Sequence, residues 1–419
     1  MGGIFFNLNS LKMLNLEQKQ QFSEILEELG KSLDISETQH NAAVKSYEAV
    51  GNWLSKYDSE LAPYEPVILP QGSFMFGTMI KPIHEKDDLD IDLVCQLTGK
   101  KPDWTQAHLK KVVGDRLKEN NTYKSMLDLE GRRCWTLVYS DSSNYHLDIL
   151  PSIVSNGYNV ILEKAFSKNE NRDFDVLAIR ITDREEPDYN ITTNPEYWLK
   201  SNPFGYGRWF FNRASLSLNK SFSINESIKP VPKYQKQKLP LQRVIQILKR
   251  HRDMMFNGNS DKPISIIITT LASKAYNKET NIIEALQNII QQMTSFIEEK
   301  YSEKYYRKIK WISNPVNEQE NFADKWPDNP KRQENFYKWI EQIQKDVLNI
   351  TQQRGMMSIQ ESFEKSFGKD IVTKAFSNYG ERVRILRENG AIKMASISGM
   401  LGNTGITISN HDFFGYEEK

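Results

Sequence analysis

Residues 69–97 read LPQGSFMFGTMIKPIHEKDDLDIDLVCQL, and this stretch decides which fold the chain can adopt. It joins a Gly-Ser turn, Gly72 and Ser73, to an apolar segment that carries Asp90 and Asp92. Side chains alternate between the two faces of a β-strand, so LDIDLVCQL places both aspartates on one face and the leucines and isoleucine on the other. Two carboxylates on one face repel each other unless a cation lies between them.

A third acid, Asp148, lies inside another apolar segment, HLDIL, and a neighbouring strand would bring it to the same face. Hard divalent ions such as Mg²⁺ prefer carboxylate oxygens. A pair of such ions ~4 Å apart can activate an attacking hydroxyl and stabilise a leaving pyrophosphate.

The Gly-Ser turn could bind the phosphates. Gly72 lets backbone N–H groups approach a phosphate, and the Ser73 hydroxyl can donate to it. Alone, a Gly-Ser pair is usually a turn and Asp-x-Asp a solvated edge; the pattern becomes specific only in combination.

The composition is that of an ordinary globular protein, with 39% hydrophobic and 26% charged residues in 419 positions. The 55 basic and 54 acidic side chains leave a net charge of +1, so no global field points to DNA, RNA or an anionic membrane as an obligate partner. Cys95 and Cys134 are too few for a disulfide scaffold or a thiolate zinc site. No export signal or run of ~20 apolar residues is present, so we expect a cytoplasmic protein that does not enter a membrane.

Periodicity predicts an α+β fold. Ser36 and Gln39 have the form of a capping box at the start of a long amphipathic helix, whose apolar stripe is Ala43, Tyr47, Val50, Leu54 and Tyr57. RCWTLVYS and YHLDILPSI read as a hairpin around DSSN. Helical periodicity dominates after a connecting segment that ends near residue 239, and 399–419 is glycine-rich and aperiodic. We therefore predict an N-terminal helix and catalytic core over 1–215, a helical lobe over 216–398 and a flexible tail over 399–419.

The order Gly-Ser, Asp-Ile-Asp and a later strand aspartate resembles the polymerase-β-like nucleotidyltransferases. Further blocks resemble the bacterial cGAS/DncV-like nucleotidyltransferases, or CD-NTases, and span most of the chain: LDISETQHNAAVKSYEAVGNWL, SNPFGYGRWF, LQRVIQILKRHRDMMF, KPISIIITTLASKAY and NPVNEQENFADKW. The resemblance implies a bilobal enzyme with a mixed sheet, a long N-terminal spine helix and an oligoadenylate-synthase-like helical lobe. It also implies synthesis of a nucleotide second messenger in anti-phage CBASS signalling.

Carried over by motif, the resemblance makes Gly72 and Ser73 nucleotide-binding residues and makes Asp90, Asp92 and Asp148 a catalytic triad that binds two Mg²⁺ ions, with Mn²⁺ as a substitute. It assigns Lys249 in ILKRHRD and Ser265 in KPISI to the donor triphosphate. Pro263 suits a first helical turn, which would put the Ser265 hydroxyl at a phosphate-attracting N-terminus. The alternatives are a serine packed in an apolar helix and a lysine on a solvated basic face.

Other residues remain open between two interpretations. Asp87 and Asp88 are either loop acids or helpers in positioning metal or substrate. Tyr206, Trp209 and Phe210 either stack on a nucleobase or pack in the core. His84 and His146 have no partner that the sequence identifies. The HDFFG segment with Phe413 and Phe414 is a candidate peptide for regulatory partners.

The sequence thus predicts a nucleotidyltransferase that condenses nucleoside triphosphates, ATP and GTP foremost, into a cyclic di- or trinucleotide with release of pyrophosphate, for a downstream effector to sense. Asp148 is the candidate general base. The animal DNA sensor that this family resembles carries a zinc-binding His/Cys insertion and a basic DNA-binding platform. Two cysteines and a net charge of +1 supply neither feature, so activation by double-stranded DNA is not expected. The rival hypotheses are a template-independent transferase that extends RNA ends and a catalytically silent nucleotide-binding scaffold.

Overall fold

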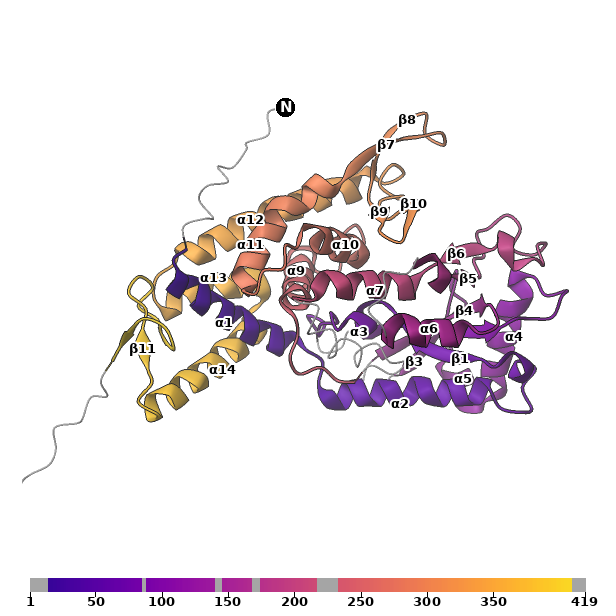
Figure 1. Cartoon of the computed structure of the whole chain (residues 1–419), viewed down its shortest axis with the longest axis horizontal. Helices are drawn as coiled ribbons and strands as arrows, with labels where there is room; N and C mark the ends of the chain where they lie inside the picture. The colour runs from indigo at the N-terminus through magenta and orange to yellow at the C-terminus, as the bar shows by residue number, and fades with distance from the viewer. Residues whose placement is uncertain (1–13, 85–87, 140–144, 168–173, 217–232, 409–419) are drawn as a thin grey trace, which may run out of the picture. The chain divides into compact units, whose positions relative to one another are not determined.

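The computed structural model describes residues 14–84, 88–139, 145–167, 174–216 and 233–408, and within them the chain divides into two compact units (Figure 1). We call the described residues within 1–34, 243–312 and 322–419 the helical unit, and those within 35–242 and 313–321 the sheet unit. In this described part, no helix is both long enough and apolar enough to cross a membrane.

The sheet unit is built on a mixed six-stranded sheet with the order β1-β2-β4-β5-β6, in which β3 also pairs with β4. Strand β2 runs antiparallel to β1 and parallel to β4, and β3, β5 and β6 add antiparallel pairs. The predicted hairpin is confirmed as β3 and β4, while its turn at 140–144 lies outside the described residues. The strands are β1 (Val67–Pro70), β2 (Leu89–Thr98), β3 (Trp135–Tyr139), β4 (Tyr145–Val154), β5 (Ile179–Ile181) and β6 (Leu199–Ser201).

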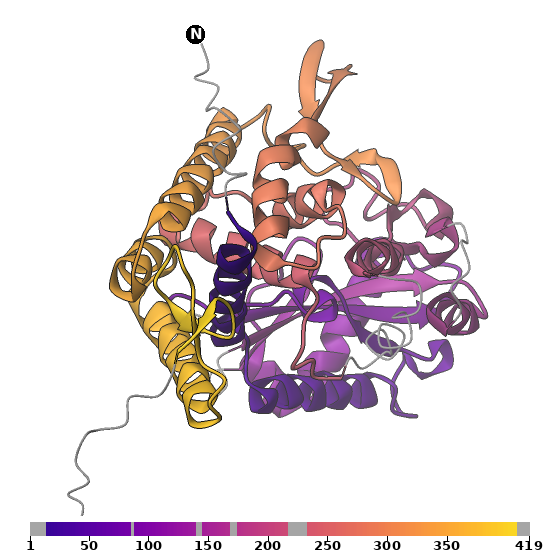
Figure 2. The same ribbon diagram turned by 60° about the vertical axis from the view of Figure 1, so that its left-hand side comes forward.

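One face of this sheet forms the main core of the sheet unit. Helices α2 (Glu37–Leu54), α4 (Gln106–Glu119) and α5 (Asn121–Met126) contribute apolar side chains that pack against β2, β3 and β4, and Figure 2 shows α2 running along the sheet. The capping box at Ser36 is confirmed, with the Ser36 hydroxyl accepting the Gln39 N–H at 3.1 Å. The helix ends at Leu54, so the prediction for Tyr57 is wrong: this side chain is exposed, because the chain turns after the C-cap at Ser55. The other elements of the unit are α3 (Gly72–Phe76), α6 (Tyr158–Ser167), α7 (Pro203–Ala214), β9 (Ser313–Asn314) and β10 (Asn317–Asn321).

The helical unit packs amphipathic helices against one another and adds small two- and three-stranded sheets. On α12, apolar residues recur at helical spacing and all of them are buried: Phe336, Ile340, Ile343, Val347 and Ile350. Most of α9 also belongs to the helical unit. Its apolar side chains are buried up to Leu248, and Met255 near the end of the helix is 40% exposed. The elements are α1 (Leu16–Leu33), α9 (Pro240–Phe256), α10 (Ser265–Ala275), α11 (Ile282–Gln292), β7 (Glu298–Ser302), β8 (Arg307–Trp311), α12 (Pro330–Gln352), α13 (Met356–Phe367), α14 (Lys369–Glu388), β11 (Lys393–Met394), β12 (Leu401–Gly402) and β13 (Ile406–Thr407). The predicted α+β class with a helical C-terminal region is confirmed.

A buried arginine ties α1 to α9 inside the helical unit. The Arg243 side chain is fully buried and donates from Nη1 to Asp34 Oδ2 at 2.8 Å and from Nη2 to Glu27 Oε1 at 3.0 Å. Gln246 Nε2 donates to the other oxygen of Asp34 at 2.8 Å. A Cβ at Gly30 would lie 2.6 Å from Arg243 Cδ, so this position of α1 must lack a side chain. The buried charge is thus compensated by two carboxylates and an amide.

The division of the chain differs from the predicted boundaries at both ends. The first helix, α1, is grouped with the C-terminal helices, because its buried face packs on α14 and α11 and Ser23 Oγ bonds Asn281 Oδ1 at 2.6 Å. Of the predicted tail, residues 399–408 form β12 and β13, and Met400 is buried. The candidate partner peptide with Phe413 and Phe414 lies outside the described residues.

Candidate active site

The Gly-Ser turn forms the start of α3 and is held against β2. Gly72 has φ +59°, a backbone conformation that only glycine adopts without strain. The Gln71 N–H donates to the Asp92 carbonyl at 2.8 Å, which fixes the turn to the strand. A Cβ built on Gly72 would lie 2.6 Å from Asp92 Oδ2. The turn therefore approaches the Asp92 carboxylate so closely that no side chain fits between them.

The three predicted acids lie on one face of the sheet. Along β2, Leu89, Ile91 and Leu93 are buried, Asp92 is half-buried and Asp90 is exposed. Asp92 and Asp148 are register partners on the parallel strands β2 and β4, which places their side chains side by side, since neighbouring strands are ~4.8 Å apart. Asp90 lies two residues before Asp92 and thus on the same face. This face is opposite the main core, beside the Gly-Ser turn.

The donor set fits a hard divalent cation. All three side chains offer carboxylate oxygens, the ligands that Mg²⁺ prefers, and two of them lie at paired positions of adjacent strands. As the side chains are placed, no three acidic, imidazole or thiol groups within the described ranges converge on one point. Asp90, Asp92 and Asp148 stay the predicted metal ligands, and Asp92 and Asp148 would contribute from neighbouring strands.

Two further residues, His146 and Thr136, lie at this face, and the sequence analysis gave neither of them a role. His146 Nε2 lies 2.7 Å from Asp88 Oδ2, and its Nδ1 lies 3.8 Å from Asp90 Oδ1. Because His146 is two residues before Asp148 on one strand, its presence on this face could have been read from alternation. Thr136 Oγ1 donates to Asp148 Oδ1 at 2.5 Å, and this contact depends on the register of the hairpin, which the sequence does not show. Asp87 lies outside the described residues.

The thiol of Cys134 borders the same acids. Burial first, and then the negative charges of Asp148 and Asp92, raise the pKa of this thiol to about 12. Cys134 is therefore a neutral thiol at physiological pH. It does not add a thiolate to the carboxylate set.

Lys249 and Ser265 lie in the helical unit, on α9 and at the first residue of α10. Pro263 precedes the helix instead of occupying its first turn, because the N-cap is Ile264. The Ser265 hydroxyl accepts a hydrogen bond from Arg252 Nη1 at 2.9 Å. The three carboxylates belong to the sheet unit. Contact of Lys249 and Ser265 with a triphosphate that is bound at these carboxylates therefore stays a prediction.

The alternative of a solvated basic face on α9 is wrong. Lys249, Arg250, His251 and Arg252 are all buried, between 2% and 6% exposed. Arg250 Nε donates to the Phe367 carbonyl at 2.9 Å, and His251 Nε2 lies 2.9 Å from Asp346 Oδ2. The run is buried because α12 and α13 supply these oxygen partners.

The side chains of Tyr206 and Phe210 on α7 belong to the core and not to a base-stacking surface, whereas Trp209 is half-buried. Tyr206 and Phe210 are buried, with ring centroids 5.4 and 5.0 Å from that of Phe76 at the end of α3. Buried rings of this kind cannot receive a nucleobase without repacking. Their contacts with Phe76 instead pack α7 against α3.

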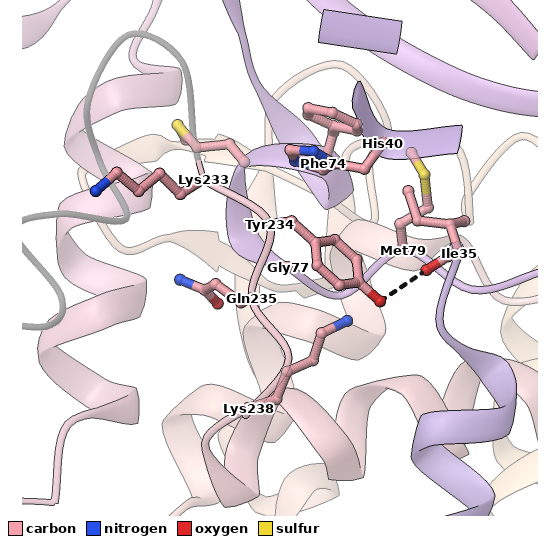
Figure 3. Close-up of a pocket in the computed structure, with 10 residues that line it drawn as sticks. Ile35, His40, Phe74, Gly77, Met79, Lys233, Tyr234, Gln235 and Lys238 are labelled. Atoms are coloured by element: carbon pink, nitrogen blue, oxygen red, sulfur yellow. Dashed lines mark hydrogen bonds between the residues drawn. The ribbon is translucent and has the colours of Figure 1, made fainter. Parts of the chain in front are cut away.

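A small cavity of the sheet unit borders α3 (Figure 3). The His40 ring stacks on Phe74 with centroids 4.9 Å apart, and the Tyr234 hydroxyl donates to the Ile35 carbonyl at 3.2 Å. Burial lowers the pKa of His40, with the nearby Lys238 acting in the same direction. The described lining residues include none of the three acids, so the cavity is separate from the carboxylate face. They are Ile35, His40, Phe74, Met75, Gly77, Met79, Lys233, Tyr234, Gln235 and Lys238.

Comparison with known proteins agrees with this geometry. The model of the nucleotidyltransferase domain of DncV-like cyclic GMP-AMP synthases matches residues 66–151, which contain the Gly-Ser turn and all three acids. A c-di-GMP synthase of Roseivirga ehrenbergii is 29% identical over 383 residues, 90% of this chain and 92% of that protein. The cyclic dinucleotide synthase CdnG of Bradyrhizobium diazoefficiens is 22% identical over 378 residues, 86% of this chain and 83% of that protein.

Solved structures show the same fold. The Bradyrhizobium diazoefficiens CD-NTase CdnG, in complex with GTP, superimposes with a TM-score of 0.62 at 19% identity, covering 86% of this chain and 99% of that one. CdnC of E. coli MS115-1 with ATP gives a TM-score of 0.55 at 14% identity, covering 85% and 98%. The chain thus contains a segment that matches the DncV-like nucleotidyltransferase domain, is similar over nearly its whole length to two cyclic dinucleotide synthases, and shares its fold with the CD-NTases of known structure.

Proposed function

We propose that this enzyme condenses purine nucleoside triphosphates, with GTP among them, into a cyclic di- or trinucleotide and releases pyrophosphate. The observation that carries the proposal is the pairing of Asp92 with Asp148 on neighbouring strands, with Asp90 on the same face and the Gly72 turn against it. The relatives named c-di-GMP synthase and cyclic dinucleotide synthase support a cyclic dinucleotide product. The GTP complex of the similar CdnG structure supports a guanine nucleotide as substrate.

In the proposed reaction, a ribose hydroxyl of one nucleotide attacks the α-phosphorus of a second triphosphate. The new bond joins the hydroxyl oxygen to phosphorus, the bond to the bridging oxygen breaks, and pyrophosphate leaves with that electron pair. Asp148 accepts the hydroxyl proton, and a second, intramolecular transfer closes the ring of a dinucleotide. The Gly72 and Ser73 N–H groups and the Ser73 hydroxyl bind phosphate oxygens. Mg²⁺ or Mn²⁺, held by Asp90, Asp92 and Asp148, would supply the positive charge that stabilises the developing negative charge.

Thin-layer chromatography of products from four labelled triphosphates, before and after phosphatase, tests this proposal. A phosphatase-resistant spot that requires Mg²⁺ or Mn²⁺ is expected, since a cyclic product has no terminal phosphate. Addition of an RNA primer separates the rival transferase, which would extend the primer and give no resistant spot. Absence of any product from every triphosphate combination would favour the silent nucleotide-binding scaffold.

The biological setting that we propose is anti-phage CBASS signalling in the cytoplasm, without activation by double-stranded DNA. The match to the DncV-like nucleotidyltransferase domain supports this setting, and the free thiols of Cys95 and Cys134 support a reducing compartment. A structure of the similar E. coli CdnC in complex with a HORMA protein supports the search for a regulatory partner here. An effector that senses the product completes the proposal.

Lys249→Met is expected to raise the apparent KM for nucleoside triphosphate about 10- to 100-fold and to change kcat less. A charge-assisted contact to phosphate is worth ~1.5–3 kcal/mol, and methionine keeps the buried stem of the side chain filled. Initial rates over a range of triphosphate concentrations measure the effect. Lys338→Met, at an exposed position of α12, is the control with the same change of charge. An unchanged KM would make Lys249 a structural residue of α9.

A further inference from the structure

Asp148 receives a hydrogen bond from a strand that carries none of the predicted catalytic residues. Thr136 on β3 is its antiparallel register partner, and the Thr136 hydroxyl donates to Asp148 Oδ1 at 2.5 Å. On the other side of Asp148, the register partner is Asp92 on β2. The general-base candidate is therefore flanked by one carboxylate and one hydroxyl in a row across three strands.

We propose that Thr136 is a positioning residue that holds Asp148 in its working orientation. This inference rests on the proposed function of the carboxylate face. The hydroxyl has a single proton to donate, so it occupies Oδ1 and leaves the remaining lone pairs of the carboxylate for the metal and for the substrate proton. A charge-assisted O–H···O⁻ bond of this length is among the stronger hydrogen bonds in proteins.

The negative charge of Asp92 explains why Asp148 needs a hydrogen-bond partner such as the Thr136 hydroxyl. Asp92 and Asp148 are adjacent like charges, and a carboxylate on a strand can rotate away from its neighbour about χ1 and χ2. Thr136 is β-branched and therefore stiff at χ1, so its hydroxyl is a fixed point to which Asp148 is tied. The bond keeps the two carboxylates side by side where a shared cation requires them.

The chain is itself anchored directly before Thr136. Arg132 and Arg133 both donate to the buried carboxylate of Asp183, at 2.6 and 2.7 Å from their Nε atoms. Trp135 Nε1 donates to the Lys110 carbonyl at 2.8 Å. Its ring packs on Gly114, where a Cβ would lie 2.2 Å from Trp135 Cζ2. Preorganisation of this kind is what a positioning residue requires, because a mobile support would not fix the group that it holds.

A matched pair of substitutions separates positioning from simple strand propensity. Thr136→Val keeps the β-branched shape and removes the donor, whereas Thr136→Ser keeps the donor and removes the methyl group. Thr98→Val, at the end of β2, controls for the exchange of threonine for valine elsewhere on the sheet. Each variant is tested as the full chain for melting temperature, for kcat and KM, and for Mn²⁺ affinity by electron paramagnetic resonance without nucleotide.

We expect Thr136→Val to lower kcat and weaken Mn²⁺ binding by about 10- to 100-fold each, the range found for partners that orient metal ligands. The KM for nucleoside triphosphate and the melting temperature should stay close to wild type, and Thr136→Ser and Thr98→Val should stay close to wild type in every measurement. If Thr136→Val binds Mn²⁺ as tightly as the wild type, the positioning role is overturned.

The Mn²⁺ measurement also keeps this inference distinct from the proposed function. A wild-type protein that makes no product yet binds Mn²⁺ in a Thr136-dependent way would refute the synthesis and support the positioning role. If the wild-type protein makes product and Thr136→Val equals it in rate and in Mn²⁺ affinity, the synthesis is supported and the positioning role is overturned. A wild-type protein that binds no Mn²⁺ would overturn both.

Discussion

Replacement of Asp90 and Asp92 together by asparagine should abolish product formation and leave the protein folded. Asparagine keeps the shape of aspartate and removes two negative ligands, so the divalent cation loses most of its binding site. Metal stabilisation of the transition state is worth several kcal/mol, and we expect the rate to fall by at least about three orders of magnitude. The apolar side of β2, with Leu89, Ile91 and Leu93, is untouched by the change.

Chromatographic yield and thermal melting with and without Mg²⁺ measure this effect. The metal-free double variant should melt at the wild-type temperature or above it, because a repulsive pair of charges has been removed. Added Mg²⁺ should raise the melting temperature of the wild type only. Asp103→Asn, at an exposed loop acid of the same unit, is the control for loss of a surface carboxylate. A double variant that still works at nearly the wild-type rate would contradict the metal assignment.

Gly72→Ala should lower the rate of synthesis about 100-fold while the fold survives. A residue with a Cβ at φ +59° is strained by about 1 kcal/mol, which a protein of this size tolerates. The larger effect is local, because the new methyl group would lie 2.6 Å from Asp92 Oδ2 and must displace that carboxylate. A displacement of ~1 Å at a reacting group can reduce a rate by about two orders of magnitude.

The chain offers a matched control for this substitution. Gly99, just after β2, has φ +87°, and no atom lies within 4 Å of a Cβ built there. Gly99→Ala therefore carries comparable backbone strain without a clash, and it should lower the melting temperature by a similar amount at nearly wild-type activity. Equal losses of activity in both variants would show that strain alone, and not the displacement of Asp92, explains the effect.

Local sequence patterns predicted the part of the fold that carries the acids. The alternation in LDIDLVCQL gives β2 and its polar face, and the capping box at Ser36 gives the start of α2. The hairpin of β3 and β4 followed from two apolar runs around a polar turn. Each of these signals is contained in a few consecutive residues, which is why it can be read without knowledge of the rest of the chain.

Contacts that depend on distant parts of the chain could not be predicted in this way. The burial of the basic run beside Lys249 is decided by oxygen partners more than 90 residues later, such as Asp346. The grouping of α1 with the C-terminal helices depends on packing against α14. The bond from Thr136 to Asp148 depends on which residues of the hairpin face each other, and a register shift of one residue would turn the hydroxyl to the other side of the sheet.

The bond between Arg243 and Asp34 also has a consequence for the order of folding. It joins residues 209 positions apart, and closure of so long a loop in an unstructured chain costs about 5 kcal/mol of entropy. A folded sheet unit removes most of this cost, because Tyr234 bonds the Ile35 carbonyl and so brings the two ends of that long segment together. We therefore expect the sheet unit to fold first. During synthesis on the ribosome, α1 is made first, yet it must wait for its partners until Arg243 and the helices beyond it have emerged.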